Sequence, residues 1–341
     1  MIDLRSDTFT LPSKEMMDTI LEAKLGDDVW EEDPTVKELE ELIAQMLGKE
    51  AGLLVSSGTQ GNLVSHMTHL NRGDGVVLEK ESHINQYEVG GISQISGAYP
   101  LLLDSDNGLM NPEDVKSVFA TPYNIHKVTP KLLCLENTHN RGGGKIIPKK
   151  NLDSLAHIAH ESGASVHLDG ARLFNAVVAT GMSADRIVEN MDSIQICLSK
   201  GLGCPIGSLI VGTEEFIHNA RRNRKVVGGG MRQAGIIAAP GIYALNNMIN
   251  RLDEDHKHAK MLGDKLREVK DFIVKPVDTN IVIVDTSKSQ LSADDVCAKL
   301  EKNGILVTHM GEQIFRMVTY FGITKEHILS ALDVISDVFL T

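Results

Sequence analysis

Cysteine is scarce in this chain of 341 residues, with four in all. They form no CxxC pair and no Cys/His spacing typical of a metal site, so we interpret them as buried or incidental thiols and expect no bound metal. Such thiols fit a reducing compartment, and a cytoplasmic protein is expected. The four are Cys134, Cys197, Cys204 and Cys297.

Long apolar runs are missing as well. No stretch is long enough to span a bilayer. The first seven residues, 1–7, contain no apolar core of the kind that a signal peptide has. The pattern is typical of a soluble protein.

Positive charge is in the minority, because 34 Lys and Arg residues face 46 Asp and Glu residues and give a formal net charge of -12. Neither nucleic acid nor an anionic membrane is therefore an expected partner. A small anionic ligand remains compatible with this charge, since a few basic side chains and helix N-termini can form a local positive pocket.

Short apolar runs are frequent, and amphipathic helical patterns separate most of them. Residues 34–47 and 151–161 are two such helices, each with apolar residues on one face. Alternation of this kind predicts an α/β fold with a mainly parallel sheet between helices. The predicted strands include residues 53–55, 76–78, 132–135, 165–168 and 208–211.

The pattern changes near Asp253, where a charged helix, residues 253–269, begins. A strand at 281–284, a helix at 293–302, a strand near Ile305 and a final helix are expected to follow. This indicates a small α+β domain at 251–341, behind a large domain at 1–250 that includes the N-terminal segment 1–15.

A basic run breaks the composition of the large domain. Residues 221–225 read RRNRK, and Gly228, Gly229 and Gly230 follow them. We predict a loop here.

Residues 56–62, SSGTQGN, lie between a predicted strand and a predicted helix. Free backbone N–H groups at the start of that helix would form a cradle for an anion. Taken alone, the segment is more typical of an ordinary turn with a helix cap.

Two further residues have a suggestive place in the chain. Asp169 ends an apolar strand, where α/β sheets bind ligands and where a carboxylate could keep a pyridine nitrogen protonated, although an Asp there can equally cap a helix. Lys200 lies on a glycine-rich turn after an apolar stretch. Most lysines are solvated surface charges, but one placed in this way suits Schiff-base chemistry, which needs a desolvated amine.

An anion cradle, a strand-end Asp and a Lys on a turn, in this order, resemble the fold-type I pyridoxal-phosphate enzymes. The detailed sequence is similar to that of the threonine aldolase family along almost the whole chain. The matching stretches are residues 3–8, 26–29, 32–35, 57–59, 136–140, 169–172, 199–203 and 228–233.

The resemblance implies a seven-stranded, mainly parallel sheet sandwiched by helices, with pyridoxal 5'-phosphate as cofactor. It implies that Lys200 carries the cofactor as a Schiff base and that Asp169 pairs with its pyridine nitrogen. Gly58 and Thr59 are implied to hold the phosphate, and His83 to stack on the ring.

Arginines have the remaining implied binding roles. Arg232 would support the phosphate near a subunit boundary, with an ordinary salt bridge at a helix start as its alternative. Ser6, Arg172 and Arg316 would hold the substrate carboxylate, since the planar fork of Arg suits bidentate binding, and Arg172 is also expected beside the cofactor.

The implied reaction is retro-aldol cleavage of L-threonine, L-allo-threonine and related β-hydroxy-α-amino acids to glycine and an aldehyde. His83 or His126, directly or through water, would be the general base. A homo-oligomer is expected, with a dimer as the minimum and a tetramer as the fuller assembly, and with the active site between two subunits.

Other functions stay open at this stage. Another fold-type I enzyme, such as a β-eliminating lyase, an aminotransferase or an amino-acid racemase, would bind the cofactor with the same residues. A cofactor-binding sensor and a cofactor-free α/β protein are the alternatives from other classes. Three departures from the family pattern, Trp30-Glu31, Cys204 and Tyr320, leave the catalytic groups in place, and Trp30 and Tyr320 are expected to alter the pocket wall.

Overall fold

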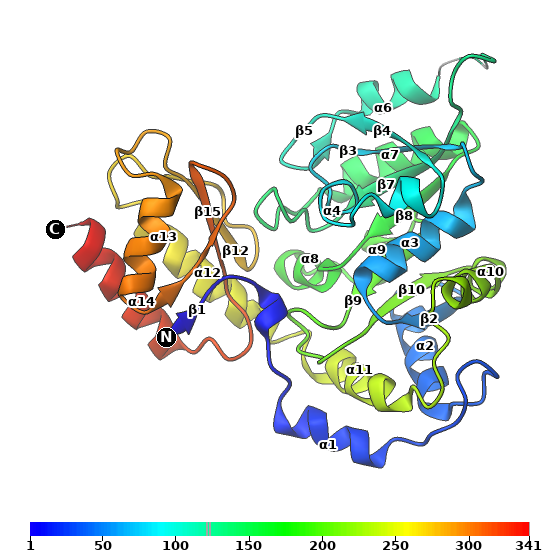
Figure 1. Cartoon of the computed structure of the whole chain (residues 1–341), viewed down its shortest axis with the longest axis horizontal. Coiled ribbons are helices and arrows are strands. Elements are labelled where there is room, and N and C mark those ends of the chain that lie inside the picture. The colour runs from blue at the N-terminus through cyan, green and yellow to red at the C-terminus, as the bar shows by residue number, and fades with distance from the viewer. Residues whose placement is uncertain (121, 123, 341) are drawn as a thin grey trace.

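A seven-stranded sheet forms the centre of the large domain in the computed structural model, which describes residues 1–120, 122 and 124–340 (Figure 1). Strand β10 runs antiparallel to both of its neighbours, and the other neighbouring strands run parallel. The predicted mainly parallel α/β fold is confirmed. In spatial order the strands are β2 (Ala51–Val55), β10 (Ser208–Gly212), β9 (Ser193–Cys197), β8 (Ser165–Asp169), β7 (Pro130–Glu136), β3 (Gly75–Glu79) and β4 (Tyr99–Leu103).

Helices cover both faces of this sheet because side chains alternate along each strand. In β2, Leu54 packs into the core that the helices α2, α7, α8 and α11 share, whereas Leu53 and Val55 pack against α3 and α10. Within the described part of the chain, no helix is long and apolar enough to cross a membrane. The bounds are α2 (Pro34–Met46), α3 (Gly58–His69), α7 (Lys149–Glu161), α8 (Leu173–Thr180), α10 (Glu214–Val226) and α11 (Gly235–Asn247).

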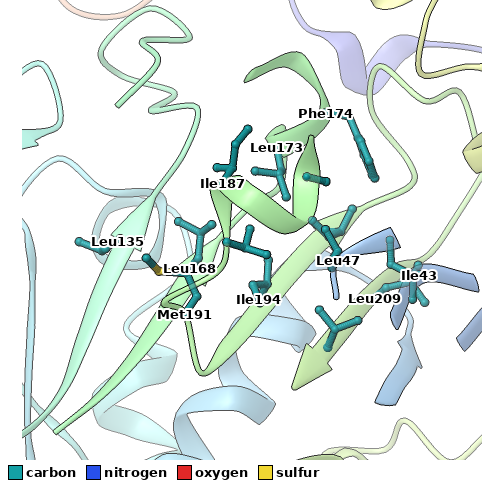
Figure 2. Close-up of a cluster of buried hydrophobic side chains, with 14 of the residues drawn as sticks. Ile43, Leu47, Leu135, Leu168, Leu173, Phe174, Ile187, Met191, Ile194 and Leu209 are labelled. Carbon is teal, nitrogen blue, oxygen red and sulfur yellow. The ribbon is translucent and has the colours of Figure 1, made fainter. Parts of the chain in front are cut away.

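Figure 2 shows part of the larger core on the α2 and α8 face. Leu168 and Ile194 extend from neighbouring parallel strands toward Leu173 of α8, and all three are fully buried. Burial of each aliphatic side chain of this size stabilises the fold by about 1.5–3 kcal/mol. The core therefore fixes β8 and β9, whose carboxyl ends lead to Asp169 and Lys200.

The small domain is a four-stranded antiparallel sheet with helices, which confirms the α+β elements predicted after Asp253. Its separate apolar core includes Val282, Phe315 and Ile328, all fully buried. The sheet has the order β11 (Ile273–Val274), β12 (Ile281–Asp285), β15 (Ile314–Val318), β14 (Thr308–His309), and the helices are α12 (Leu252–Leu266), α13 (Ala293–Lys302) and α14 (Lys325–Phe339).

The start of the chain joins the small domain, although the sequence analysis assigns segment 1–15 to the large one. Strand β1 (Ile2–Asp3) pairs in parallel with β13 (Ile305–Leu306), and the fully buried Leu4 lies in the small-domain core. Figure 1 shows this blue segment beside the orange and red elements before the chain continues to α1 (Lys14–Glu22) under α11. Residues 5–10 therefore pass from one domain to the other.

The predicted loop is wrong for residues 221–225, because they belong to α10, whereas residues 228–230 do lie in a loop after this helix. The Thr213 hydroxyl caps the helix by accepting the Phe216 N–H at 3.2 Å, and an apolar face packs on β2 and β10. Two of the cationic side chains are neutralised: Arg224 donates to Asp28 at 2.7 Å and Arg221 to Glu40 at 3.0 Å. Acidic partners far away in the sequence make the basic run compatible with a helix.

Candidate active site

A cavity of about 390 Å³ lies between the two domains. Its lining comes from the N-terminal segment, from loops that follow the carboxyl ends of β3, β7, β8 and β9, and from β14 and β15 of the small domain. Strand ends are the usual ligand site of such sheets. The lining residues are Ser6, Thr8, His83, Tyr87, Asn140, Arg141, Arg172, Lys200, Thr308, His309, Met310, Gly311 and Arg316.

Lys200 follows β9 on the predicted turn. The turn is closed by the Gly203 N–H, which donates to the Lys200 carbonyl at 2.9 Å, and Gly203 has a φ of 80°. A left-handed conformation of this kind favours glycine. Leu198, two residues earlier, is fully buried and anchors the backbone. The half-buried Lys200 side chain therefore enters the cavity from a fixed position.

The start of α3 has the features of an anion cradle. The Ser57 hydroxyl caps the helix by accepting the Gln60 N–H at 3.1 Å. The N–H groups of Gly58 and Thr59 are among the first of the helix and have no acceptor within it. A Cβ on Gly58 would lie 2.7 Å from Cys197 Sγ, so this position requires glycine and the sheet approaches the helix start closely.

Asp169 ends β8 and is buried. Its Oδ1 accepts the Ala171 N–H at 3.0 Å and its Oδ2 accepts an Asn62 Nδ2–H at 2.9 Å. These two donors fix the orientation of the carboxylate. The N-cap of the next helix, α8, is Arg172, so Asp169 does not have the capping role that the sequence left open.

His83 begins the short helix α4 (His83–Gln86), and its backbone N–H donates to Glu136 Oε2 at 2.6 Å. Its Nδ1 lies 2.9 Å from Glu88 Oε1. Burial lowers the pKa of His83, but the hydrogen bond to Glu88 and the charge of Asp169 outweigh burial and raise that pKa above its ordinary value. Ligand atoms of His83, Glu88 and Asp169 lie within 4.8 Å of one another. This spacing alone would suit a metal ion. The two carboxylates are instead joined by Asn62, which donates an N–H to each of them.

The two predicted carboxylate-binding arginines differ in their partners. Arg172 binds Asp7 through Nε and Nη2, both at 2.7 Å, and both side chains are buried. Arg316 donates to Asn140 Oδ1 at 3.2 Å and to the Arg5 carbonyl at 3.2 Å, and its buried Nε has no partner among the described residues. Burial, with the charge of Arg172, lowers the pKa of Arg316. Arg316 therefore presents a positive charge without a carboxylate partner in the described chain.

Comparisons with known proteins show the family of this chain. The family model described as "Beta-eliminating lyase" matches residues 3–289. The chain is 40% identical to low-specificity L-threonine aldolase 1 of Arabidopsis thaliana over 100% of this chain and 97% of that protein. It is also 40% identical to the low-specificity L-threonine aldolase of Escherichia coli (strain K12), over 96% of each. The chain belongs to the threonine aldolase family. Its predicted membership of this family of lyases is confirmed.

Solved structures support the same fold. The threonine aldolase of Leishmania major has a TM-score of 0.85 at 19% identity and covers 99% of both chains. A structure described as "SPT with PLP internal aldimine" has a TM-score of 0.78 at 17% identity, over 99% of this chain and 87% of the other. The fold of this threonine aldolase family member is thus the fold-type I architecture predicted from the sequence.

Two predicted residues of the threonine aldolase site lie away from the cavity. His126 is in an exposed turn before β7, and its backbone N–H donates to Asn124 Oδ1 at 2.9 Å. Arg232 is also exposed and forms a salt bridge with Asp27 at 2.9 Å, close to the start of α11. The salt bridge is the alternative that the sequence analysis gave for Arg232. The roles of both residues stay predictions, because neither residue lines the cavity of its own chain.

The two expected wall residues also lie elsewhere. Tyr320 packs in the small-domain core and donates its hydroxyl to the Asp3 carbonyl at 2.8 Å. The Trp30 side chain is exposed on the surface. Neither residue lines the cavity, so the expectation that they alter its wall is wrong for the single chain.

The sequence analysis missed several groups that hold the candidate site together. Asp7 and Asn140 lie inside the quoted family stretches, so their position next to recognised residues was an available signal. Glu88 and Asn62 offered a weaker signal, which was only their closeness in the chain to His83 and to the anion cradle. Their contacts with His83 and Asp169 join separate elements and become visible only in the fold.

Proposed function

We propose that the protein is a pyridoxal-phosphate-dependent aldolase. It would cleave the Cα–Cβ bond of L-threonine, L-allo-threonine and related β-hydroxy-α-amino acids, releasing glycine and an aldehyde. The observation that carries this proposal is the arrangement at the ends of the strands. Lys200 and Arg316 line one cavity, Arg316 has no carboxylate partner among the described residues, and Asp169 is buried at the end of β8, the strand next to β9. Bound pyridoxal phosphate supplies an electron sink for the carbon that loses the aldehyde.

The residues suit the cofactor. Lys200 would attach it through its amine, and the first N–H groups of α3, those of Gly58 and Thr59, would bind its phosphate. Asp169, whose two carboxylate oxygens each accept an N–H, would keep a proton on the ring nitrogen. His83 would cover the ring, at the place where Glu88 holds its imidazole.

The substrate carboxylate would bind chiefly to Arg316, because the charge of Arg172 is already matched by Asp7. Arg172 and Ser6 line the same cavity and would complete the carboxylate pocket with hydrogen bonds. Holding the carboxylate there orients the Cα–Cβ bond for cleavage. His83, directly or through water, would take the β-hydroxyl proton, and His126 remains the second candidate.

A β-eliminating lyase is the second candidate function, and the description of the matching family model favours it. The two reactions give different products from L-threonine. An aldolase releases glycine and acetaldehyde, whereas elimination removes the Cα proton and gives 2-oxobutanoate and ammonia.

Product analysis with purified, cofactor-loaded protein tests the proposal. L-threonine and L-allo-threonine should yield glycine and acetaldehyde in equal amounts, and D-threonine should be inert because it cannot present its carboxylate and side chain to the same groups. The same assay with Lys200→Ala is the control and should show nearly no turnover. 2-Oxobutanoate as the main product would reassign the chain to elimination.

We further propose a cytoplasmic homo-oligomer, at least a dimer and in full a tetramer. The free thiols Cys134, Cys197, Cys204 and Cys297 support a reducing compartment. The surface positions of His126 and Arg232 support a site that is completed by a second copy of the chain.

A further inference from the structure

A continuous chain of buried and partly buried hydrogen bonds runs from the candidate site, between α3 and the strands β8 and β9, to the far end of α3. Asn62, in α3, donates from Nδ2 to Glu88 Oε1 at 2.8 Å and to Asp169 Oδ2 at 2.9 Å. On its other side, Asn62 Oδ1 lies 3.0 Å from Nε2 of His167 in β8. His167 Nδ1 is 2.8 Å from Ser193 Oγ, and His69 Nε2 is 2.7 Å from the same hydroxyl.

The two carboxylates fix the direction of this chain. Only the NH₂ side of the Asn62 amide can face two carboxylate oxygens, so Oδ1 must accept a hydrogen from His167 Nε2. Burial, with the nearby His66 and His69, holds the pKa of His167 well below its ordinary value, so the ring is neutral and carries its single hydrogen on Nε2.

The remaining bonds follow from this tautomer. His167 Nδ1 is then an acceptor for the Ser193 hydroxyl hydrogen, and Ser193 Oγ accepts from His69 Nε2–H. Burial lowers the pKa of His69 to about 4, so this imidazole is neutral too. Every donor from His69 to Asn62 therefore points toward Glu88 and Asp169, and aligned bonds of this kind polarise one another.

We propose that Asn62 is the positioning residue of the candidate site. Its amide, oriented by His167, holds Glu88 and Asp169 together. It would thereby fix both the carboxylate that meets the cofactor's ring nitrogen and, through Glu88, the imidazole of His83. The cofactor part of this inference rests on the proposed function, whereas the coupling of Asn62 to His83 concerns the protein alone.

An ordinary buried network that only stabilises the fold is the competing explanation. Two buried carboxylates whose nearest groups lie within a few ångströms would repel each other unless a donor lies between them. A network that served packing alone could do without one of the two charges. Here one amide serves both, and each carboxylate has a second partner in the site, His83 for Glu88 and Ala171 N–H for Asp169.

The decisive variant is Asn62→Leu, which keeps a similar volume and removes the amide. Without the donor, Glu88 should gain a proton more readily and support the His83 cation less, so the pKa of His83 should fall. NMR titration of the His83 imidazole in cofactor-free protein measures this change without any turnover. The charged or titratable groups around His83 are Glu88, Asp169, Glu136, Lys200 and Tyr87.

Cofactor binding gives the second readout. Asn62→Leu should bind pyridoxal phosphate about 10- to 100-fold more weakly, because it loses a hydrogen bond to a charged group. Fluorescence titration with the cofactor measures this affinity. Ser65→Ala is the matched control, because Ser65 is fully buried on the same helix and donates to the Gly61 carbonyl, outside the chain of bonds. It should leave the His83 titration and cofactor affinity unchanged.

A milder variant covers the case in which Asn62→Leu fails to fold. Ser193→Ala cuts the chain two bonds beyond Asn62 with little change in volume, and it should move the His83 pKa in the same direction by less. An unchanged His83 titration and unchanged cofactor affinity in a folded Asn62→Leu or Ser193→Ala protein would overturn the proposal. If the titration shifts as expected but no aldehyde is released by wild-type protein, only the proposed function fails.

Discussion

At the scale of single residues, the two arginines of the cavity have different duties. Arg172 has its charge matched by the fully buried Asp7, whereas Arg316 has only neutral acceptors among the described residues. A matched buried pair mainly holds the structure, and an unmatched buried cation is available for an anionic ligand.

Substitution of each arginine should separate these duties. Arg172→Ala leaves Asp7 buried and unpaired, so the free energy of unfolding should fall by about 3–5 kcal/mol in urea titrations. Arg316→Ala should leave the free energy of unfolding nearly unchanged. It should lower kcat/KM for L-threonine by an amount that corresponds to a loss of about 2–5 kcal/mol in transition-state binding. Arg316→Lys, which keeps the charge, should recover part of the loss. Equal effects of the two alanine variants on stability would contradict the assignment.

Asp7 also predicts how the fold responds to acid. Burial raises its pKa, but Arg172 outweighs burial and the pKa falls from 3.8 to about 2. A carboxyl group with a lowered pKa in the fold contributes stability that is complete above its unfolded pKa and is lost as pH falls through its folded pKa. The contribution of Asp7 should therefore disappear between about pH 4 and pH 2.

Comparison with Asp7→Asn isolates this contribution. The difference in the free energy of unfolding between wild-type and Asp7→Asn protein should shrink by about 2 kcal/mol as pH falls from 5 toward 2. Urea titrations over this pH range measure the difference. Asp18→Asn, at an exposed position of α1, is the control and should differ from wild type by a small, constant amount. A difference that does not change with pH would mean that Asp7 is not held ionised by Arg172.

The residues found from the sequence are those whose position along the chain is itself the signal. Asp169 is the last residue of an apolar strand and Lys200 lies three residues after another, so the ends of these strands place them. The Asp7–Arg172 pair joins residues 165 positions apart. No local pattern indicates it, because it depends on β1 pairing with the small domain and bringing the N-terminal segment to the cavity.

At the scale of elements, α3 connects the candidate phosphate cradle with the buried hydrogen-bond chain. Its first turn approaches β9 so closely that Gly58 has no room for a methyl group beside Cys197. The predicted role of the cradle depends on this contact, since a helix N-terminus binds an anion only when its first N–H groups point at the ligand.

Gly58→Ala should therefore move the start of α3 and weaken binding of pyridoxal phosphate, measured by fluorescence titration. The added Cβ would meet Cys197 Sγ at 2.7 Å and Gln195 Nε2 at 3.2 Å. The double variant Gly58→Ala/Cys197→Ala removes the closer contact and should restore part of the affinity, and Cys197→Ala alone is the control. No recovery in the double variant would show that the alanine acts on the backbone N–H groups rather than through the contact with Cys197.

Strands and amphipathic helices were predictable because their apolar period is local. Helix α10 was not predictable, since its run of basic residues suggests charge repulsion. Only the fold shows that Asp28 lies beside Arg224 and that Glu40 lies beside Arg221. Ion pairing between distant segments decides this element, and one sequence does not display such pairing.

At the scale of the whole molecule, the cavity depends on both domains and on the N-terminal segment that passes between them. Two predicted site residues, His126 and Arg232, are exposed and outside this cavity. In the homo-oligomer that we propose, these two residues serve the site of another copy, and the active unit is at least a dimer with twofold symmetry.

Mixed dimers test the shared site directly. Lys200→Ala and Arg232→Ala proteins should each have little activity, because one lacks the amine and the other lacks the support for the phosphate. In a mixed dimer with a shared site, one of the two sites carries both changes and the other carries neither. After subunit exchange of equal amounts, about a quarter of wild-type activity should return, since half of the dimers are mixed and half of their sites are intact.

Lys200→Ala mixed with Asp169→Asn is the control and should recover nothing, because both residues come from the same chain. A fully active monomer in light scattering, or no recovery at any mixing ratio, would place the complete site within one chain and leave Arg232 with only its salt bridge to Asp27.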